Sequence, residues 1–363
     1  MTLEEISNLF LIEGEYLRSE LITDGHINST YRVFFLRHGE EKDYIIQKIN
    51  KYVFKKPEEV MENIFNVTEY IRNKIKSKGM SAKRYVLHFQ KTVDGKYFII
   101  DETGEYWRCS RFIDDCASYN ETADLKVIEE SGKAFGEFQG YLADFDVKKL
   151  HITIPHFHNT PLRYETFKKS LETDTLKRKQ EVSSEIKACL KFEELAEKMY
   201  RMQRAGELPL KVTHNDTKCN NVLFDAKTSE HLSVIDLDTV MPGLIAFDFG
   251  DAIRFIGNNS KEDEIDLNKV YLNMDKYEAF AKGFIGMVGE TLTEKEIETM
   301  ALGAFTMTVE CGMRFLTDYL DGDKYFKINY SRHNLDRARS QFKLATDILS
   351  KLSEMEIIVK KYC

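Results

Sequence analysis

One short stretch of the chain combines acidic, amide and basic side chains at close spacing. Residues 212–238 read VTHNDTKCNNVLFDAKTSEHLSVIDLD, with His214, Asp216 and Asn221 at H-x-D-x-x-x-x-N spacing. A further acid, Asp236, ends the apolar run SVI fifteen residues after Asn221. A carboxylate at an attacking hydroxyl, with Mg²⁺ on the phosphates, is the minimum that phosphoryl transfer from ATP requires. Mg²⁺ prefers such oxygen ligands, few in number.

This stretch resembles the catalytic loop of the aminoglycoside phosphotransferase, choline kinase and protein kinase superfamily. The resemblance implies that ATP is the phosphate donor, that Asp216 is the catalytic residue, and that Asn221 and Asp236 bind Mg²⁺. The alternative is that Asp216 and Asn221 are turn and cap residues beside an apolar strand. The hairpin and the strand-terminal acid that follow the loop favour the catalytic interpretation.

A second acid competes with Asp236 for the metal. Residues 248–250 spell Asp-Phe-Gly, the metal-binding triplet of protein kinases, but Asp248 lies 27 residues after Asn221. That separation is too long for the single hairpin that normally joins the two metal ligands. We therefore assign Asp236 to the metal and expect Asp248 and Asp251 to brace the loop and cap the next helix.

Two further loop residues have two interpretations each. Lys218, two residues after Asp216, could offset charge growing on the transferring phosphoryl group, as in protein kinases, or could be a solvated loop lysine. We expect His214 to be a buried hydrogen-bonding brace rather than a proton shuttle.

The elements around this loop divide the chain. Before residue 115, strand-like runs alternate with turns at Asp94-Gly95 and Thr103-Gly104, which are hairpin signals. A helix, roughly Pro57–Lys78, interrupts them, with Pro at its start and Gly79 past its end. The strand-like runs are Thr30–Leu36, Tyr44–Ile49, Val86–Lys91, Tyr97–Ile100 and Tyr106–Ile113.

After Asp115 the apolar spacing becomes helical, as in the series Leu125 to Phe145 and Leu335 to Leu352. Only Lys211–Asp238 reads as loop, strand, turn, strand. The order predicts an α+β, protein-kinase-like fold of two lobes. Residues 1–113 would form the nucleotide-binding lobe, and residues 114–363 a mainly helical lobe with the catalytic loop and the sugar site that the resemblance below implies.

The nucleotide side departs from the protein kinase pattern. The first hairpin turn, residues 24–31, has one glycine and no GxGxxG, so phosphate contacts would come from backbone N–H groups of the turn and from its side chains. Adenine would lie at the hinge, against the backbone of Arg111–Ile113. The predicted contacts in the turn are Gly25, Asn28, Ser29 and Thr30.

Strand alternation makes one position ambiguous. The place of the usual phosphate-binding lysine falls on Gln47, whereas Lys48 points to the other face of the sheet. Either Gln47 donates to the phosphates as a neutral group, or the register slips by one residue.

Composition limits the partners. Lys plus Arg is 52 and Asp plus Glu is 60, a net charge of −8, which disfavours nucleic acid and anionic membranes. The six cysteines show no CxxC spacing, as expected for a reduced cytoplasmic protein. No run approaches the ~18 consecutive apolar residues of a membrane helix. The oligomeric state is not indicated.

Longer motifs narrow the resemblance. The chain carries DGHINSTY at 24–31, HFHNTP at 156–161, THNDTKCNN at 213–221, IDLDTVMPG at 235–243 and ECGMRFLTDYLDGDKYF at 310–326. In these it is similar to the N-acetylhexosamine 1-kinases across nearly its whole length. The resemblance implies that the acceptor is the anomeric hydroxyl of N-acetylglucosamine or N-acetylgalactosamine. The implied sugar-site candidates are His158, Arg314, Asp318 and Tyr325, together with Asp216.

Other readings stay open. Arg314 could merely pair with a carboxylate of its lobe. His156 and His158 alternate like strand neighbours, but two histidines without a third ligand make a poor metal site. The acceptor could be another small alcohol, such as choline, homoserine, methylthioribose or an aminoglycoside. A catalytically silent ATP-binding regulator is the alternative from a different class.

Overall fold

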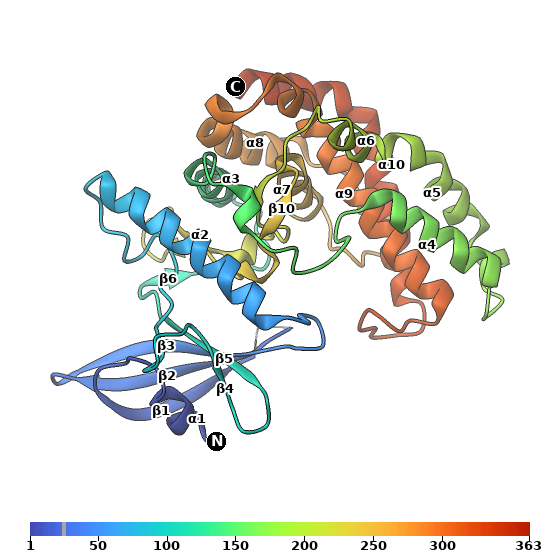
Figure 1. Ribbon diagram of the computed structural model, residues 1–363. Coiled ribbons are helices and arrows are strands. Elements are labelled where there is room, and N and C mark those ends of the chain that lie inside the picture. The colour runs from blue at the N-terminus through green and yellow to red at the C-terminus, as the bar shows by residue number, and fades with distance from the viewer. Residues whose placement is uncertain (24–26) are drawn as a thin grey trace.

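The computed structural model describes residues 1–23 and 27–363 (Figure 1). Asp24, Gly25 and His26 lie outside the described residues, and the predicted phosphate contact of Gly25 lies there with them. An antiparallel five-stranded sheet comes first along the chain, and a mainly helical part follows. The predicted kinase-like fold class is confirmed.

The N-terminal sheet has the strand order β1-β2-β3-β5-β4. Alternation along the strands places Val33, Phe35 and Ile46 on one face, where Ile6 and Phe10 from the N-terminal segment cover them. The opposite face turns toward the helical part. The strands are β1 (Glu15–Ile22), β2 (Ser29–Arg37), β3 (Glu40–Ile49), β4 (Ile99–Ile100) and β5 (Tyr106–Arg111), and the short helix α1 is Leu3–Ser7.

One predicted strand is wrong. Residues 86–91 do not form a regular strand, and only an isolated bridge joins Phe89 to Ser110. The Asp94-Gly95 turn does form, with the Thr92 N–H donating to the Lys96 carbonyl at 2.7 Å. Its first arm pairs partly with the N-terminal segment instead, because Leu11 N–H donates to the Lys91 carbonyl. The second predicted arm is correspondingly reduced to β4.

Helix α2 (Pro57–Ser77) matches its sequence signals within a residue. Proline occupies the first turn, where its missing N–H costs nothing, and Gly79 follows the helix with a φ of 74°. Val60, Ile64 and Ile71 share the buried face. Figure 1 shows α2 running between the sheet and the C-terminal helices.

The helical part surrounds a small strand region that carries the loop of interest. Residues 211–238 contain β8 (Val222–Asp225) and β9 (His231–Val234), the two strands that the loop–strand–turn–strand pattern predicts, and also β7 (Lys211–Thr213), where that pattern predicts a loop. β6 (Cys116–Ala117) pairs with β8, and β10 (Met241–Gly243) pairs with β7. The helices are α3 (Leu125–Tyr141), α4 (Thr160–Thr173), α5 (Ser183–Ala196), α6 (Lys198–Arg204), α7 (Ile245–Ala252), α8 (Met274–Val288), α9 (Glu294–Asp321) and α10 (His333–Tyr362).

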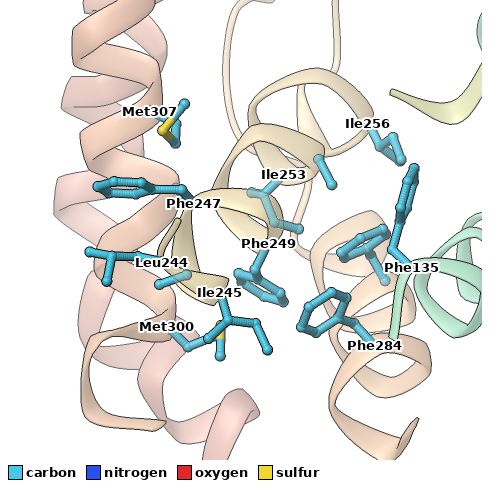
Figure 2. Close-up of a cluster of buried hydrophobic side chains, with 14 of the residues drawn as sticks. Phe135, Leu244, Ile245, Phe247, Phe249, Ile253, Ile256, Phe284, Met300 and Met307 are labelled. Atoms are coloured by element: carbon cyan, nitrogen blue, oxygen red, sulfur yellow. The ribbon is translucent and has the colours of Figure 1, made fainter. Parts of the chain in front are cut away.

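Helix α7 lies in the middle of the helical core (Figure 2). Its Ile245 and Phe249 are buried among apolar side chains from α3, α8 and α9, including Phe135, Phe284 and Met300. Close packing of this kind fixes the helix axis, and therefore fixes the polar side chains that α7 carries.

In residues 1–23 and 27–363, no helix is both long and apolar enough to cross a membrane.

Glycines let α7 approach α9 closely. Gly303 of α9 lies against the Ala246 carbonyl, and a Cβ added at Gly303 would overlap that oxygen. Gly250 of α7 faces the same point of α9. The two helices can cross at this short distance only because glycine, which has no side chain, occupies both positions.

Substitution Gly303→Ala should destabilise the protein by about 1–3 kcal/mol, because the added methyl forces the two helices apart. Exposed Gly286 of α8 is the matched control, since a Cβ there would meet nothing within 4 Å. Gly286→Ala should stabilise by about 0.5–1 kcal/mol through helix propensity. Urea unfolding measures both, and a neutral Gly303→Ala would contradict the packing account.

Candidate active site

Hairpin register brings the two predicted metal ligands together. Val222 of β8 pairs with Val234 of β9, and the Ile235 N–H donates to the Asn221 carbonyl at 2.9 Å. Asn221 and Asp236 are therefore next to this last ladder bond. Asp236 has a left-handed backbone, with a φ of 58°, so the chain turns sharply as the strand ends.

The Asp216 side chain is held from two directions. Lys218 Nζ lies 2.7 Å from Asp216 Oδ1. Asn221 Nδ2 donates to Asp216 Oδ2 at 3.1 Å and to the Asp216 carbonyl at 2.8 Å. Because the Asn221 amide nitrogen faces Asp216, its side-chain oxygen is left for another partner.

His214 is a buried brace, as expected. Its side chain is fully buried, Nε2 lies 2.9 Å from the Ile235 carbonyl, and Nδ1 accepts from the Asp216 N–H at 3.2 Å. These partners fix the neutral tautomer with the proton on Nε2. The imidazole thus ties the residue before Asp236 to the backbone of Asp216.

Asp248 of α7 anchors the backbone of the H-x-D-x-x-x-x-N loop. This carboxylate on α7 is 1% exposed and accepts from the His214 and Asn215 N–H groups, both at 2.8 Å, and from Gln139 Nε2 at 2.6 Å. Burial raises the pKa of Asp248 despite these donors. The expected bracing role is confirmed by these bonds.

The expected capping role is wrong. Leu244 occupies the N-cap position of α7, and Asp248 lies within the first turn. Asp251 points back to the loop as well, accepting from the Thr217 N–H at 3.2 Å. Both acids serve the catalytic loop, because they accept from the backbone N–H groups of His214, Asn215 and Thr217 around the left-handed turn at Asn215 (φ 64°).

Asp236 is open to solvent but lies among other acids. Desolvation by the surrounding protein, followed by the charges of Asp238 and Asp216, raises its pKa to about 6. No hydrogen bond to its side chain occurs within the described residues. Negative charge from three carboxylates is therefore concentrated at Asp236. Together with the side-chain oxygen of Asn221, this charge suits the binding of a divalent cation.

Cations flank the loop on its other side. Burial would lower the pKa of Lys218, but the ion pair with Asp216 outweighs burial and raises it. Arg254 binds Asp251 at 2.9 Å and Glu262 at 2.6 Å. Burial would raise the pKa of Asp251, yet Arg254 and then Lys218 lower it. Lys218 is thus within electrostatic reach of both Asp216 and Asp251.

Two of the predicted nucleotide residues, Thr30 and Gln47, belong to a hydrogen-bond network. Gln47 pairs across the strands with Arg108, and its amide joins Thr30 Oγ1 at 3.1 Å to Arg108 Nε at 2.9 Å. Lys48 lies on the other face, with Nζ 6.0 Å from the Trp107 ring centre. The register therefore places Gln47, not Lys48, on the side of the catalytic loop.

Sequence reasoning missed the centre of this network. Arg108 forms an ion pair with Asp238, and each residue is 3% exposed. Asn28 Nδ2 donates to the second Asp238 oxygen at 2.6 Å. An arginine within the apolar run of β5, and the second acid of Ile-Asp-Leu-Asp238, were the available signals.

The remaining nucleotide candidates lie at the ends of strands of the sheet. Ser29 begins β2, and Arg111 ends β5 with its N–H donating to the His88 carbonyl at 2.9 Å. Ile113 is buried just beyond β5, and its carbonyl accepts from Cys116 Sγ. The contact of Arg111–Ile113 with adenine stays a prediction.

A wall of mixed charge, formed around Glu310 by His158, Arg163 and Arg314, includes two of the predicted sugar-site residues. His158 Nδ1 lies 2.9 Å from Glu310, which also accepts from Thr160 Oγ1 at 2.9 Å. Burial would raise the pKa of Glu310, but His158, Arg163 and Arg314 lower it. His158 also helps to lower the pKa of Asp251, which links this wall to the loop.

Arg163 and Arg314 are cations in excess here. Within the described residues, neither has a carboxylate within 4 Å, and Arg163 bonds only the Phe157 carbonyl at 3.0 Å. Burial, and then the nearby charge of Arg314, lowers the pKa of Arg163. A pocket of about 220 Å³ is lined by His158, Asn215 and Phe247, among others, and its lining does not include Arg163 or Arg314.

Asp318 holds the backbone of the loop that follows α9 and does not face solvent. Its buried carboxylate accepts from the N–H groups of Lys324, Tyr325 and Phe326 at 2.8–2.9 Å and from Asn334 Nδ2 at 2.9 Å. These bonds present Tyr325, which is 72% exposed, with Arg314 5.9 Å from its ring centre. Asp318 therefore fixes the backbone that carries Tyr325, and a direct contact of Asp318 with a sugar stays a prediction.

His156 and His158 are not strand neighbours. Residues 153–157 form bends and turns, with His156 exposed at a φ of 59°, while His158 turns inward to Glu310. Within the described part of the chain, no group of three His, Cys, Asp or Glu side chains could hold a metal ion.

A strand-rich first part, a braced H-x-D-x-x-x-x-N loop and a strand-terminal acid beside it define a kinase-like phosphotransferase. The chain belongs to the phosphotransferase enzyme family APH, whose model matches residues 20–280. It is an ATP-dependent phosphotransferase, and its acceptor is addressed below.

Solved structures share the fold. An aminoglycoside phosphotransferase from Alicyclobacillus acidocaldarius superposes with a TM-score of 0.62 at 10% identity, covering 99% of this chain and 97% of that one. Choline kinase from Cryptosporidium parvum gives 0.56 at 14% identity, covering 95% and 92%. Spectinomycin phosphotransferase in complex with ADP and spectinomycin gives 0.54 at 14%, covering 94% of each chain.

The raised pKa of Asp236 predicts a stability cost at neutral pH. A carboxyl whose pKa is higher in the folded state stabilises the fold at low pH, and this contribution is lost as pH rises through about 6. In EDTA, Asp236→Asn should therefore melt above the unchanged protein at pH 7.5, with a smaller gap at pH 5. Differential scanning calorimetry checks this, and a gap independent of pH would contradict it.

Proposed function

We propose that the protein transfers the γ-phosphate of ATP to the anomeric hydroxyl of an N-acetylhexosamine, N-acetylglucosamine or N-acetylgalactosamine, and releases the sugar 1-phosphate and ADP. Residues 1–113 would bind the nucleotide. Residues 114–363 would supply the catalytic loop and the sugar site. The observation that carries the proposal is the set of long motifs shared with N-acetylhexosamine 1-kinases, the longest of which is residues 310–326.

Two of the motifs, those at 156–161 and 310–326, meet in space, which supports the proposal. His158 and Thr160 come from the motif at 156–161, and both contact Glu310 from the motif at 310–326. Arg314 lies one helical turn after Glu310, and Tyr325 lies beneath its guanidinium. Segments separated by about 150 residues thus build one wall.

The charge of this wall also bears on the acceptor. Two guanidinium groups, those of Arg163 and Arg314, act on the single carboxylate of Glu310, and Asp251 is paired with Arg254, so the wall carries excess positive charge. A site for an aminoglycoside or a choline needs acidic or aromatic groups against its cation. Excess guanidinium donors instead suit the hydroxyl and acetamido oxygens of a neutral sugar.

The residues of the loop supply the chemistry. Asp216 would accept the proton of the anomeric hydroxyl as its oxygen bonds to the γ-phosphorus, while the bond from that phosphorus to the bridging oxygen of ADP breaks. Lys218 would stabilise negative charge on the transferring group and hold the Asp216 carboxylate in place meanwhile. An anomeric hydroxyl is more acidic than a ring alcohol, so orientation by the carboxylate suffices.

Asn221 and Asp236 fit a magnesium ion by their donor atoms and by the uncompensated charge at Asp236. Mg²⁺ bound there would screen the β- and γ-phosphates and hold them in line with the acceptor. Asp248 has no such role in this proposal, because all its described bonds go to protein donors.

A panel of sugars with ATP and Mg²⁺ tests the acceptor directly. N-acetylglucosamine or N-acetylgalactosamine should give a product whose ³¹P–¹H coupling places phosphate at C1, and the 1-O-methyl glycoside should be inert. Turnover of the methyl glycoside at a similar rate would show that another hydroxyl is attacked. Activity on choline, homoserine, methylthioribose or an aminoglycoside alone would favour the other alcohols, and no turnover would favour a silent regulator.

Arg314→Ala should lower kcat/KM for the sugar roughly 10- to 100-fold, the value of a hydrogen bond from a charged donor, and leave the KM for ATP nearly unchanged. Arg337→Ala is the matched control. That arginine comes from α10 and lies over Phe315 of α9, the residue after Arg314, with 5.3 Å to the ring centre, and it is not one of the proposed sugar-site residues. Equal losses in the two variants would contradict a substrate role for Arg314.

A further inference from the structure

Arg108 is a buried cation at the junction of the sheet and the helical part. It comes from β5, yet its Nη1 pairs with Asp238, which follows β9 in the other part of the chain. Both residues are 3% exposed. Burial of two charges has a large desolvation cost, so such a pair is seldom explained by stability alone.

The pair is connected to the first hairpin of the sheet by two routes. Asn28 donates to Asp238 at 2.6 Å, and its side-chain oxygen accepts from the Asn50 N–H at 2.9 Å. Gln47 joins Arg108 Nε to Thr30 Oγ1. Asn28 and Thr30 belong to the turn that would carry the nucleotide phosphates.

The pair is connected equally closely to the metal side. Asp238 lies in a 3₁₀ turn, Leu237–Thr239, that begins directly after Asp236. The end of this turn is fixed as well, because Asn63 of α2 donates to the Val240 carbonyl at 2.9 Å. A displacement of Asp238 would therefore move the Asp236 carboxylate.

We propose that Arg108 is a positioning residue that sets the distance between the phosphate-binding turn and the metal-binding Asp236. In protein kinases a lysine at the place of Gln47 spans this gap with a helix glutamate. Here the neutral Gln47 accepts from Arg108 Nε and so orients the guanidinium group. The Nη1 atom of the same group pairs with Asp238, two residues after the proposed metal ligand Asp236. The inference rests on the proposed assignment of Asp236 to the metal.

The Mg²⁺-dependent part of nucleotide affinity tests this role. Isothermal titration calorimetry with ADP at pH 8 gives a dissociation constant in EDTA and another in Mg²⁺. The first divided by the second is the ratio that measures how much Mg²⁺ strengthens ADP binding. Arg108→Gln should reduce that ratio by about fivefold or more, equivalent to one lost hydrogen bond, with ADP affinity in EDTA unchanged within about twofold. Arg108→Lys, which keeps the charge and loses the guanidinium group, should fall between.

Controls separate positioning from folding. Arg339→Gln removes another arginine–acid pair, with Glu185 at 2.5 Å in the helical part, and should leave the ratio unchanged. If Arg108→Gln unfolds, the double variant Arg108→Gln/Asp238→Asn removes both buried charges, and the ratio should still be reduced. Fluorescence of Trp107, the only tryptophan of the chain, reports folding of the sheet.

Two results would overturn the inference. One is a ratio within twofold of the unchanged protein in a folded Arg108→Gln or double variant. The other is an equal loss of ADP affinity in Mg²⁺ and in EDTA, which a purely structural role would give. Asp236→Asn is measured alongside: if it keeps the full ratio, the metal assignment itself fails, whatever Arg108 does.

Discussion

The catalytic loop depends on one buried carboxylate. Asp248, inside the hydrophobic core on α7, binds the N–H groups of His214 and Asn215, and so holds the two residues before Asp216. A charge in that environment is tolerated only while its donors are in place, since an unpaired buried carboxylate is very costly. The left-handed backbone at Asn215 is stable for the same reason. Asp216 is thereby fixed before any substrate binds.

Around this anchor, charge is distributed unevenly. Asp216, Asp236 and Asp238 crowd the nucleotide side, where Arg108 offsets only part of their charge, whereas Arg163 and Arg314 leave the acceptor wall positive. Such an arrangement costs stability in the free protein, as the raised pKa of Asp236 shows. Active sites commonly carry this cost, because groups held ready for a ligand lack their partner until it binds.

Much of the fold followed from local signals. The proline and glycine at the ends of α2, and the spacing from Asn221 to Asp236, have direct physical causes in helix ends and hairpin register. The segment 86–91 was mispredicted because its pairing with β5 is confined to one bridge at Phe89, and the chain beyond it pairs with the N-terminal segment at Lys91 and Val93. The second pairing is a contact between distant residues that no local pattern reveals.

The site was predictable only in part. The loop residues stand close in sequence, so their spacing gave the arrangement around Asp216. Arg108 and Asp238 are 130 residues apart, and Glu310 meets His158 across a similar separation. The sequence shows each of these as a polar residue, but only the folded chain supplies its partner. Asp318 is an opposite case. The motif at 310–326 suggested that it contacts the sugar, whereas in the folded chain its carboxylate binds backbone N–H groups.

The central claim is that Asp236 binds the metal while the Asp-Phe-Gly acid, Asp248, holds the loop. Anomalous diffraction from crystals grown with Mn²⁺ and a non-hydrolysable ATP analogue tests it most directly. The account predicts a manganese peak about 2 Å from an oxygen of Asp236 and from the Asn221 side-chain oxygen, with Asp248 still bonded to His214 and Asn215. A peak on Asp248, with Asp236 unliganded, would contradict it.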